Sequence, residues 1–136
     1  MTGIDHLLDT NVVIGLLKGS PEAAALVQQA GLSLSRAGVS QITRMELLGY
    51  PAIGDQEEQA ARAFLSSCQV IGIGDEVESL AIRLRRAGGL RLPDAIVAAT
   101  ALAVGATLLT LDQRLQRVMT EQVDAARSVA EGGAGA

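Results

Sequence analysis

The sequence predicts a single α/β domain with a mostly parallel central sheet of four to five strands flanked by helices. Short apolar runs alternate along the chain with longer segments of helical periodicity, and this alternation is typical of a parallel sheet that helices cover on both faces. The 136 residues are close to the commonest size of one domain, and 49% are hydrophobic against 19% charged. We therefore expect one domain with a buried core and exclude a disordered chain.

The first half of the chain contains two strand patterns and four helix patterns. In order, these are a strand at 4–9, helices at 10–19 and 20–31, a strand at 37–40, and helices at 41–50 and 55–67. Apolar residues at helical spacing define the first helix, which Gly19 ends. Ser20, the proline after it and Gly31 mark the two ends of the second helix. Ser40 closes a short apolar run and can cap the helix that follows.

The second half continues the alternation. In order, it contains a strand at 68–73, helices at 75–88 and 93–105, a strand at 106–112, and a short last helix that begins with residues 113–119. The helix at 93–105 is almost wholly apolar, so we expect it in the core. Because the end of the chain is rich in glycine and alanine, we assign the domain to residues 1–120 and a tail with a disordered end to residues 121–136.

The composition limits the possible partners. Fifteen acidic and eleven basic residues give a formal net charge of −4, which argues mildly against a nucleic-acid partner, although a local group of arginines or a metal-binding group of carboxylates would remove the objection. Lys18 is the only lysine, so arginines supply the other positive charges. Tyr50 and Phe64 are the only aromatic residues, and this excludes a protein that stacks single-stranded bases on aromatic rings.

Cysteine usage and hydropathy indicate a cytoplasmic protein. Cys68 is the only cysteine, so no internal disulfide can form, and we expect it to be a small buried residue at the start of a strand. The chain has neither an apolar stretch long enough to cross a membrane nor an N-terminal leader pattern. His6, the only histidine, lies in the first strand, where we expect a packed or rim residue.

Four acidic residues interrupt apolar segments at positions that this topology brings together. Asp9 and Asp112 follow the first and last strands, Asp94 begins the most apolar helix, and Glu46 lies about a turn and a half into a helix that starts at the same edge of the sheet. The carboxyl edge of a parallel sheet is where such domains place their sites. Four carboxylates in one cleft need a cation, and Mg²⁺ or Mn²⁺ fits oxygen ligands of this kind.

Each of these carboxylates also has an ordinary structural explanation. Asp9 could cap the helix that follows it, and Asp94 lies in a first helical turn, where the helix dipole favours an anion. Asp112 could be a turn residue, and Glu46 could pair with Arg44 at the rim of a helix. The argument for a metal site therefore depends on the coincidence of all four.

Three segments of the sequence closely resemble a known family. HLLDTNVVIGLL, SQITRMELLGY and LRLPDAIVAATALAVGATLLTLDQRL are similar to the PIN-domain ribonucleases, in particular to the VapC-type toxins of bacterial toxin-antitoxin pairs. The motifs occur in the family's order from about residue 5 to residue 118. The resemblance implies a PIN-like nuclease domain, Mg²⁺ dependence with Mn²⁺ able to substitute, endonucleolytic cleavage of RNA, a homodimer, and a cognate VapB-like antitoxin that inserts a segment into the active site.

The resemblance also implies roles for individual residues. The family's catalytic acids match Asp9, Glu46, Asp94 and Asp112, and its metal ligands match Asp9, Asp94 and Asp112. Its polar residues near the metal match Thr10, Asn11 and Thr110. The chain departs from the family at Leu115, where an aromatic residue is frequent, and this difference concerns packing more than chemistry.

A group of arginines leads along the sequence to Asp94. A solvated helix face explains these residues, and so does a surface that guides RNA phosphates toward the site. We take Arg83, Arg86 and Arg91 as the candidates for phosphate contact, with Arg85 beside them.

Other function classes fit the sequence less well. The glycines of IGIGDEV do not form a dinucleotide fingerprint, because Val77 stands where the third glycine is needed. A phosphorylated receiver domain would need adjacent acidic residues after the first strand and a late lysine, and the chain has neither. A non-catalytic PIN-like module that binds RNA or protein remains the alternative, but such modules often lose one or more of the acidic residues. The sequence does not identify the RNA.

Overall fold

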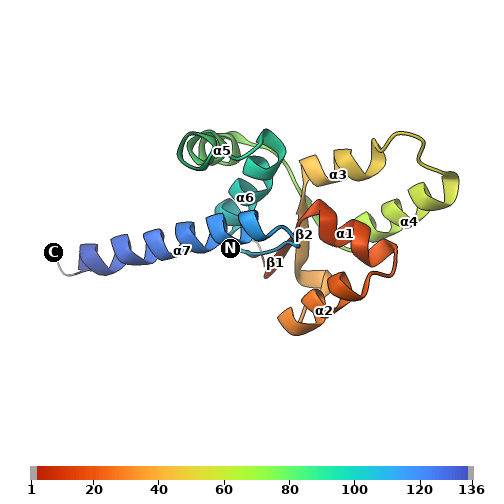
Figure 1. The fold of residues 1–136 in the computed structure, drawn as a ribbon, viewed down its shortest axis with the longest axis horizontal. Coiled ribbons are helices and arrows are strands. Elements are labelled where there is room, and N and C mark those ends of the chain that lie inside the picture. The colour runs from red at the N-terminus through yellow and green to blue at the C-terminus, as the bar shows by residue number, and fades with distance from the viewer. Residues whose placement is uncertain (1–2, 135–136) are drawn as a thin grey trace.

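The computed structural model describes residues 3–134, with side chains described for residues 3–125, and consists of a parallel sheet with helices on both sides (Figure 1). The strands are β1 (His6–Leu8), β2 (Ala37–Ser40), β3 (Gln69–Ile71) and β4 (Thr107–Leu109). The helices are α1 (Thr10–Leu17), α2 (Pro21–Ala30), α3 (Gln41–Leu48), α4 (Asp55–Ser66), α5 (Asp75–Gly88), α6 (Leu92–Val104) and α7 (Gln113–Ala134), with a short 3₁₀ turn at Leu34–Arg36. The predicted fold class is confirmed.

The four strands lie in the order β3-β2-β1-β4, and every neighbouring pair is parallel. Leu7 of β1 lies opposite Gly38 of β2 and Leu108 of β4. The pairing of β1 with β4 continues past the strand ends, because the Asp9 backbone N–H donates to the Leu109 carbonyl at 3.0 Å. The carboxyl ends of β1 and β4 are therefore held side by side, and the chain leaves both strands at one edge of the sheet.

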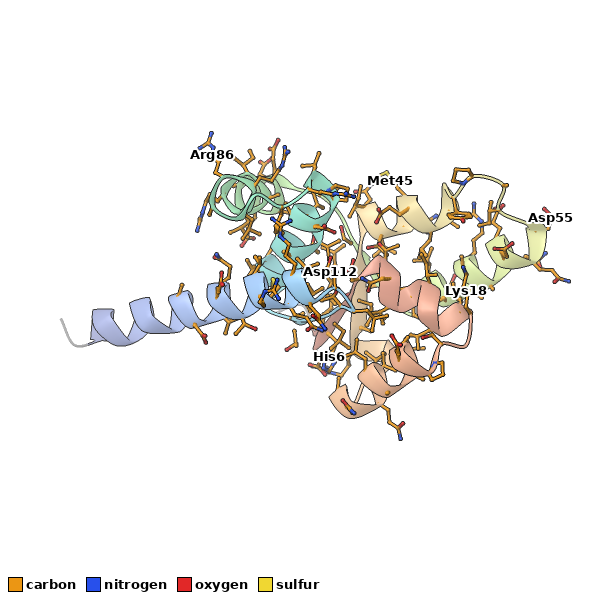
Figure 2. All side chains as sticks on the ribbon, in the orientation of Figure 1. His6, Lys18, Met45, Asp55, Arg86 and Asp112 are labelled. Carbon is orange, nitrogen blue, oxygen red and sulfur yellow. The ribbon has the colours of Figure 1, made fainter. Side chains whose placement is uncertain are left out.

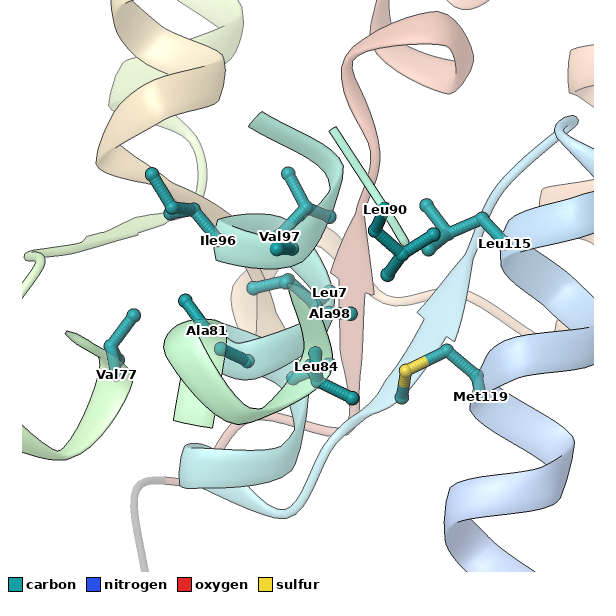
Figure 3. Close-up of a cluster of buried hydrophobic side chains, with 13 residues drawn as sticks. Leu7, Val77, Ala81, Leu84, Leu90, Ile96, Val97, Ala98, Leu115 and Met119 are labelled. Atoms are coloured by element: carbon teal, nitrogen blue, oxygen red, sulfur yellow. The ribbon is translucent and has the colours of Figure 1, made fainter. Parts of the chain in front are cut away.

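Two hydrophobic clusters cover the two faces of the sheet. Leu7 points to one face and packs with side chains of α5, α6 and α7, including Leu84, Val97 and Leu115 (Figure 3). The next residue, Leu8, points to the other face and packs with side chains of α1 to α4. This alternation follows from the two-residue period of a strand. It also makes β1 the centre of the core and fixes Asp9, which comes directly after it.

The predicted helix ends are largely confirmed. Ser20 accepts a hydrogen bond from the Ala23 N–H and caps α2, and Ser40 accepts one from the Ile42 N–H and caps α3. Helices α1 and α2 pack closely at Gly15, where an added Cβ would lie 2.7 Å from Ala23 Cβ. A larger residue at this position would force α1 and α2 apart.

The prediction of a short last helix was wrong. Helix α7 has 22 residues and extends beyond the rest of the molecule (Figure 1). Its first turns pack on the core through Leu115 and Met119, and no glycine or proline interrupts residues 113–131. The helix thus runs through most of the segment expected as a tail, whose last two residues lie outside the described residues. No helix of the described part of the chain combines the length and the hydropathy that a membrane span requires.

Candidate active site

The carboxyl edge of the sheet collects residues from four parts of the chain. Asp9 lies between β1 and α1, and Thr110 and Asp112 lie between β4 and α7. Glu46 reaches the same edge from α3, and Asp94 reaches it from the first turn of α6. Figure 2 shows Asp112 near the middle of the molecule. Burial is the largest cause that raises the pKa values of Asp9 and Asp94. The charges of Asp112 and Glu46 also raise the pKa of Asp94, and those of Asp94 and Glu46 raise that of Asp9, so these carboxylates lie within electrostatic range of one another.

Asp9 is held in place by both of its carboxylate oxygens. Oδ1 accepts the Thr10 backbone N–H at 2.8 Å, and Oδ2 accepts the Thr110 hydroxyl at 2.7 Å. The residue caps α1, which confirms the ordinary explanation of its position without excluding a metal role. Its side chain is buried, and this desolvation raises the pKa of the carboxyl group more than the two hydrogen bonds lower it. Burial without a cationic partner makes the ionised form costly.

Thr110 links the strand end of β4 to three other groups. Its hydroxyl donates to Asp9, accepts from Asn11 Nδ2 at 3.4 Å, and accepts from the Asp112 backbone N–H at 3.0 Å. Asn11 completes the connection, because its Oδ1 accepts the Leu111 N–H at 3.1 Å. The two connections that carry Asp9 and Asp112 are therefore joined through two polar side chains, which are among those that the sequence singled out.

Glu46 is attached to α1 through a threonine. The Thr10 hydroxyl donates to Glu46 Oε1 at 2.7 Å, and it also lies 3.0 Å from the hydroxyl of Thr43. Glu46 itself is exposed. Within the described residues no ion pair joins Glu46 to Arg44, so that ordinary explanation is not supported. The sequence did not single out Thr43, although its position three residues before Glu46 puts it on the same face of the helix.

Asp94 is the carboxylate with the fewest contacts. It is half-buried in the first turn of α6, and no hydrogen bond to its carboxylate is found among the described residues. Desolvation is the largest cause that raises its pKa, followed by the charges of Asp112 and Glu46, while Arg91 and Arg114 lower it. The net effect is a raised pKa despite the two arginines, so a cation bound beside Asp94 would stabilise its ionised form.

Asp112 acts as the cap of α7. Its Oδ1 accepts the backbone N–H groups of Arg114 and Leu115 at 2.9 and 3.2 Å. The ordinary structural role of Asp112 is therefore that of a helix cap and not of a turn residue, and it leaves Oδ2 without a hydrogen bond within the described part of the chain. Because the cap uses one oxygen, the other can still serve a ligand.

The donor set fits a hard divalent cation that keeps much of its water shell. Among the described residues no three histidine, cysteine, aspartate or glutamate side chains come close enough, as they stand, to hold one ion directly. Magnesium, however, is usually bound by one or two carboxylates, with water and substrate phosphate completing six oxygen ligands. Within the described residues, the Asp94 carboxylate, Asp112 Oδ2 and Glu46 Oε2 accept no hydrogen bond and can serve a ligand.

Among the arginines, the structure favours two near Asp94. Arg91 directly precedes α6 and is exposed, and its guanidinium has no hydrogen bond or ion pair within the described residues. Arg114 lies beside the turn before Asp94, because its Nη2 donates to the carbonyls of Gly88 and Gly89 at 3.1 and 3.4 Å. Sequence reasoning missed Arg114, although its place two residues after Asp112 was a usable signal. Arg83 and Arg86 are exposed on α5, and Arg86 points away from the site (Figure 2).

A groove of about 270 Å³ opens beside Glu46, between α1, α3 and α4. Its walls are mostly apolar, with Leu17, Tyr50 and Ala60 among the lining residues. Leu17 and Tyr50 are large apolar side chains that stay exposed in the isolated chain. Since Glu46 belongs to both the groove and the carboxylate group, a molecule bound in the groove would reach the site.

The fold and the site define an α/β domain with an acidic group at the carboxyl edge of a parallel sheet, suited to a divalent cation. The chain belongs to the PIN domain family, because the family model for the PIN domain matches residues 6–120.

Individual relatives agree with this assignment. Ribonuclease VapC19 of Mycobacterium tuberculosis is 30% identical over 113 residues, which cover 79% of this chain and 89% of the relative. A toxin-antitoxin complex from Klebsiella pneumoniae contains a chain that is 32% identical, with a TM-score of 0.68 and coverage of 79% of this chain and 87% of that one. VapBC2 from Rickettsia felis, bound to a promoter DNA fragment, shares the fold at 21% identity, with a TM-score of 0.67 and coverage of 85% and 93%.

Proposed function

We propose that this chain is a divalent-metal-dependent endoribonuclease and the toxin component of a toxin-antitoxin pair. The observation that carries the proposal is the placement of Asp9, Glu46, Asp94 and Asp112 on segments that begin at one edge of the sheet, with Asp9 and Thr110 joined at 2.7 Å and Glu46 joined to Thr10 at 2.7 Å. The family and the ribonuclease relative point to the same chemistry. PIN-domain ribonucleases in general depend on a divalent metal ion, and we assign Mg²⁺ here, with Mn²⁺ able to substitute.

In this proposal Asp9, Asp94 and Asp112 hold the ion, directly or through water. The bound ion supplies Lewis-acid chemistry, because it lowers the pKa of a water ligand and neutralises charge on a phosphate. Asp9 sets the position of the site, since the Thr10 N–H and the Thr110 hydroxyl fix its two oxygens. Thr110 and Asn11 keep the Asp112 connection beside it.

Glu46 is the residue best placed to handle the proton. Thr10 occupies Oε1, so the exposed Oε2 can accept a proton from the attacking water. The water oxygen then bonds to the phosphorus as the bond from phosphorus to the 3′ oxygen breaks, and a proton goes to that 3′ oxygen. The products are a 5′-phosphate and a 3′-hydroxyl.

The first test of the proposed function is metal-dependent cleavage by the purified chain. We expect no cleavage of total cellular RNA with excess chelator and recovery when Mg²⁺ or Mn²⁺ is added. Sequencing the new RNA ends would give the substrate and should show 5′-phosphates. RNA binding without cleavage at any metal concentration would instead indicate the alternative, a non-catalytic PIN-like module.

Arg91 should contribute more to RNA affinity than Arg86. The exposed and unpaired Arg91 lies beside Asp94, whereas Arg86 points away from the site (Figure 2). We expect Arg91→Gln to raise KM for RNA about threefold to tenfold and to reduce the slope of log affinity against log salt by about one. Arg86→Gln is the matched control and should leave both nearly unchanged. Equal effects of Arg91→Gln and Arg86→Gln would indicate that RNA phosphates also contact the arginines of α5.

We also propose a VapB-like antitoxin and a second copy of the chain as partners. The similar structures from Klebsiella pneumoniae and Rickettsia felis contain toxin-antitoxin pairs. The groove beside Glu46 would take an apolar segment of the antitoxin and bring it to the carboxylates. Light scattering of the purified chain should give the mass of a dimer.

The groove assignment predicts a variant that escapes inhibition. Ala60 is exposed in the groove, so Ala60→Arg should fold normally, keep RNA cleavage within about twofold, and lose inhibition by the protein encoded next to this gene. Ala63→Arg, at an exposed site on the same helix α4 that does not line the groove, is the control and should remain inhibited. Undiminished inhibition of Ala60→Arg would place the antitoxin elsewhere.

A further inference from the structure

The buried hydroxyl of Thr43 bonds to a residue of another helix. Its side chain is fully buried in α3, where an unbonded hydroxyl would be costly. Threonines inside helices commonly bond the carbonyl four residues earlier, as Thr100 does with the Ile96 carbonyl at 2.6 Å. Within the described residues the Thr43 hydroxyl has one partner, the Thr10 hydroxyl at 3.0 Å, which belongs to a different helix. Thr43 is the third residue of α3, so the residue four positions earlier lies in β2 and not in the same helix.

The partner of Thr43 is the residue that holds Glu46. Thr10 Oγ1 lies between the Thr43 hydroxyl and Glu46 Oε1, at 3.0 and 2.7 Å. The heavy-atom positions let Thr10 Oγ1 donate to either group, and its single proton goes to Glu46 because an ionised carboxylate can only accept. The Thr43 hydroxyl, whose hydrogen rotates freely, then supplies the proton of the bond between the two hydroxyls. A rotation of Thr10 about χ1 would break both contacts.

Thr10 also links Glu46 to Asp9. Its backbone N–H donates to Asp9 Oδ1, while its hydroxyl donates to Glu46 Oε1. The orientation of this one residue therefore sets the position of one proposed catalytic carboxylate relative to the other. A contact that fixes the χ1 rotamer of Thr10 therefore also fixes the position of Glu46 relative to Asp9.

We propose that Thr43 is a positioning residue for RNA cleavage: its buried hydroxyl holds Thr10 in the rotamer that orients Glu46. The inference rests on the proposed function, because it assigns Glu46 a part in the reaction. Thr43 itself is buried and touches neither substrate nor metal. It acts only through Thr10.

The test compares Thr43→Val with Thr100→Val, since both remove one fully buried hydroxyl and nearly preserve volume. We expect Thr43→Val to lower kcat about threefold to tenfold, the effect of one neutral hydrogen bond, with KM changed by less than about twofold. Thr43→Ser keeps the hydroxyl and should restore kcat, and Thr100→Val should leave kcat within about twofold of the wild type. In NMR spectra of the metal-free protein, the scalar couplings of Thr10 should report one χ1 rotamer in the wild type and averaging in Thr43→Val.

A double-mutant cycle shows whether Thr43 acts through Glu46. In a Glu46→Gln background, Thr43→Val should cause no further fall in kcat, because the oriented group is already lost. An equal fall in both backgrounds, or a kcat for Thr43→Val that matches Thr100→Val, would overturn the inference. If Glu46→Gln alone cleaves RNA at the wild-type rate, the proposed role of Glu46 fails instead. If Thr43→Val does not fold, the Thr10 rotamer and kcat are measured in Thr43→Ser instead. A Thr43→Ser variant with the wild-type Thr10 rotamer but a lowered kcat would contradict the inference.

Discussion

Replacement of Asp94 by asparagine should lower Mg²⁺-dependent RNA cleavage by about a hundredfold to a thousandfold. Asp94 is a half-buried carboxylate without a hydrogen bond in the described part of the chain, beside Asp112 and Glu46. The amide keeps the size of the side chain and removes the charge that attracts the ion. The measurement is the initial rate of cleavage at saturating RNA, over a range of Mg²⁺ concentrations.

Asp75→Asn is the matched control for this substitution. Asp75, like Asp94, lies in the first turn of a helix. It is exposed on α5 and does not contribute to the pKa of Asp9 or Asp94. A loss of helix-dipole stabilisation would affect both variants alike, whereas loss of a metal ligand would affect only Asp94→Asn. Undiminished cleavage by Asp94→Asn would remove this residue from the site.

The second large effect concerns stability without metal. The pKa values of Asp9 and Asp94 are both raised above the ordinary value of 3.8, chiefly by burial. A carboxyl group with a raised folded pKa stabilises the protein fully below its unfolded pKa, and this contribution is lost as the pH rises through the folded value. Ionised at neutral pH, the group of carboxylates should therefore oppose folding until a cation binds.

Urea unfolding of Asp94→Asn and the wild type, both with a chelator, measures how far the Asp94 charge lowers the free energy of unfolding. We expect the metal-free variant to be more stable than the wild type at about pH 7.5, with a smaller difference at about pH 4. Mg²⁺ at a hundred times its dissociation constant should stabilise the wild type by about 2.7 kcal/mol and the variant much less. The same substitution would thus lower activity and raise metal-free stability.

Asp5→Asn is the control, because its stability relative to the wild type should change with pH in the opposite direction. Asp5 is paired with Arg36 at 2.7 Å on the surface, and this guanidinium lowers the pKa of Asp5. Its stabilising contribution is therefore present above the unfolded pKa, so Asp5→Asn should become less stable relative to the wild type as the pH rises. If Asp94→Asn behaved like Asp5→Asn, the carboxylates at the sheet edge would not repel one another.

Much of the fold could be predicted from the sequence, because the local sequence signals agree with the tertiary structure. The strand and helix order, the caps at Ser20 and Ser40, and the end of α2 at Gly31 follow from patterns within a few residues. The length of helix α7 was predicted too short, because the glycine-rich end of the chain suggested a tail although the residues before it form an uninterrupted helical stretch. Its first turns are stabilised by Leu115 and Met119 against the core, and composition does not show such packing.

The sequence by itself determined the class of fold and the candidate acids, because alternating periodicity and charges inside apolar runs are local properties of the chain. Only the tertiary structure decided which side chains meet. Asp9 and Thr110 are separated by 101 residues yet lie 2.7 Å apart, and Thr10 joins Glu46 and Thr43 from another helix. Such contacts depend on the register of β1 with β4 and on the packing of α3 against α1. Both are set by the whole core, and no short stretch of sequence encodes them.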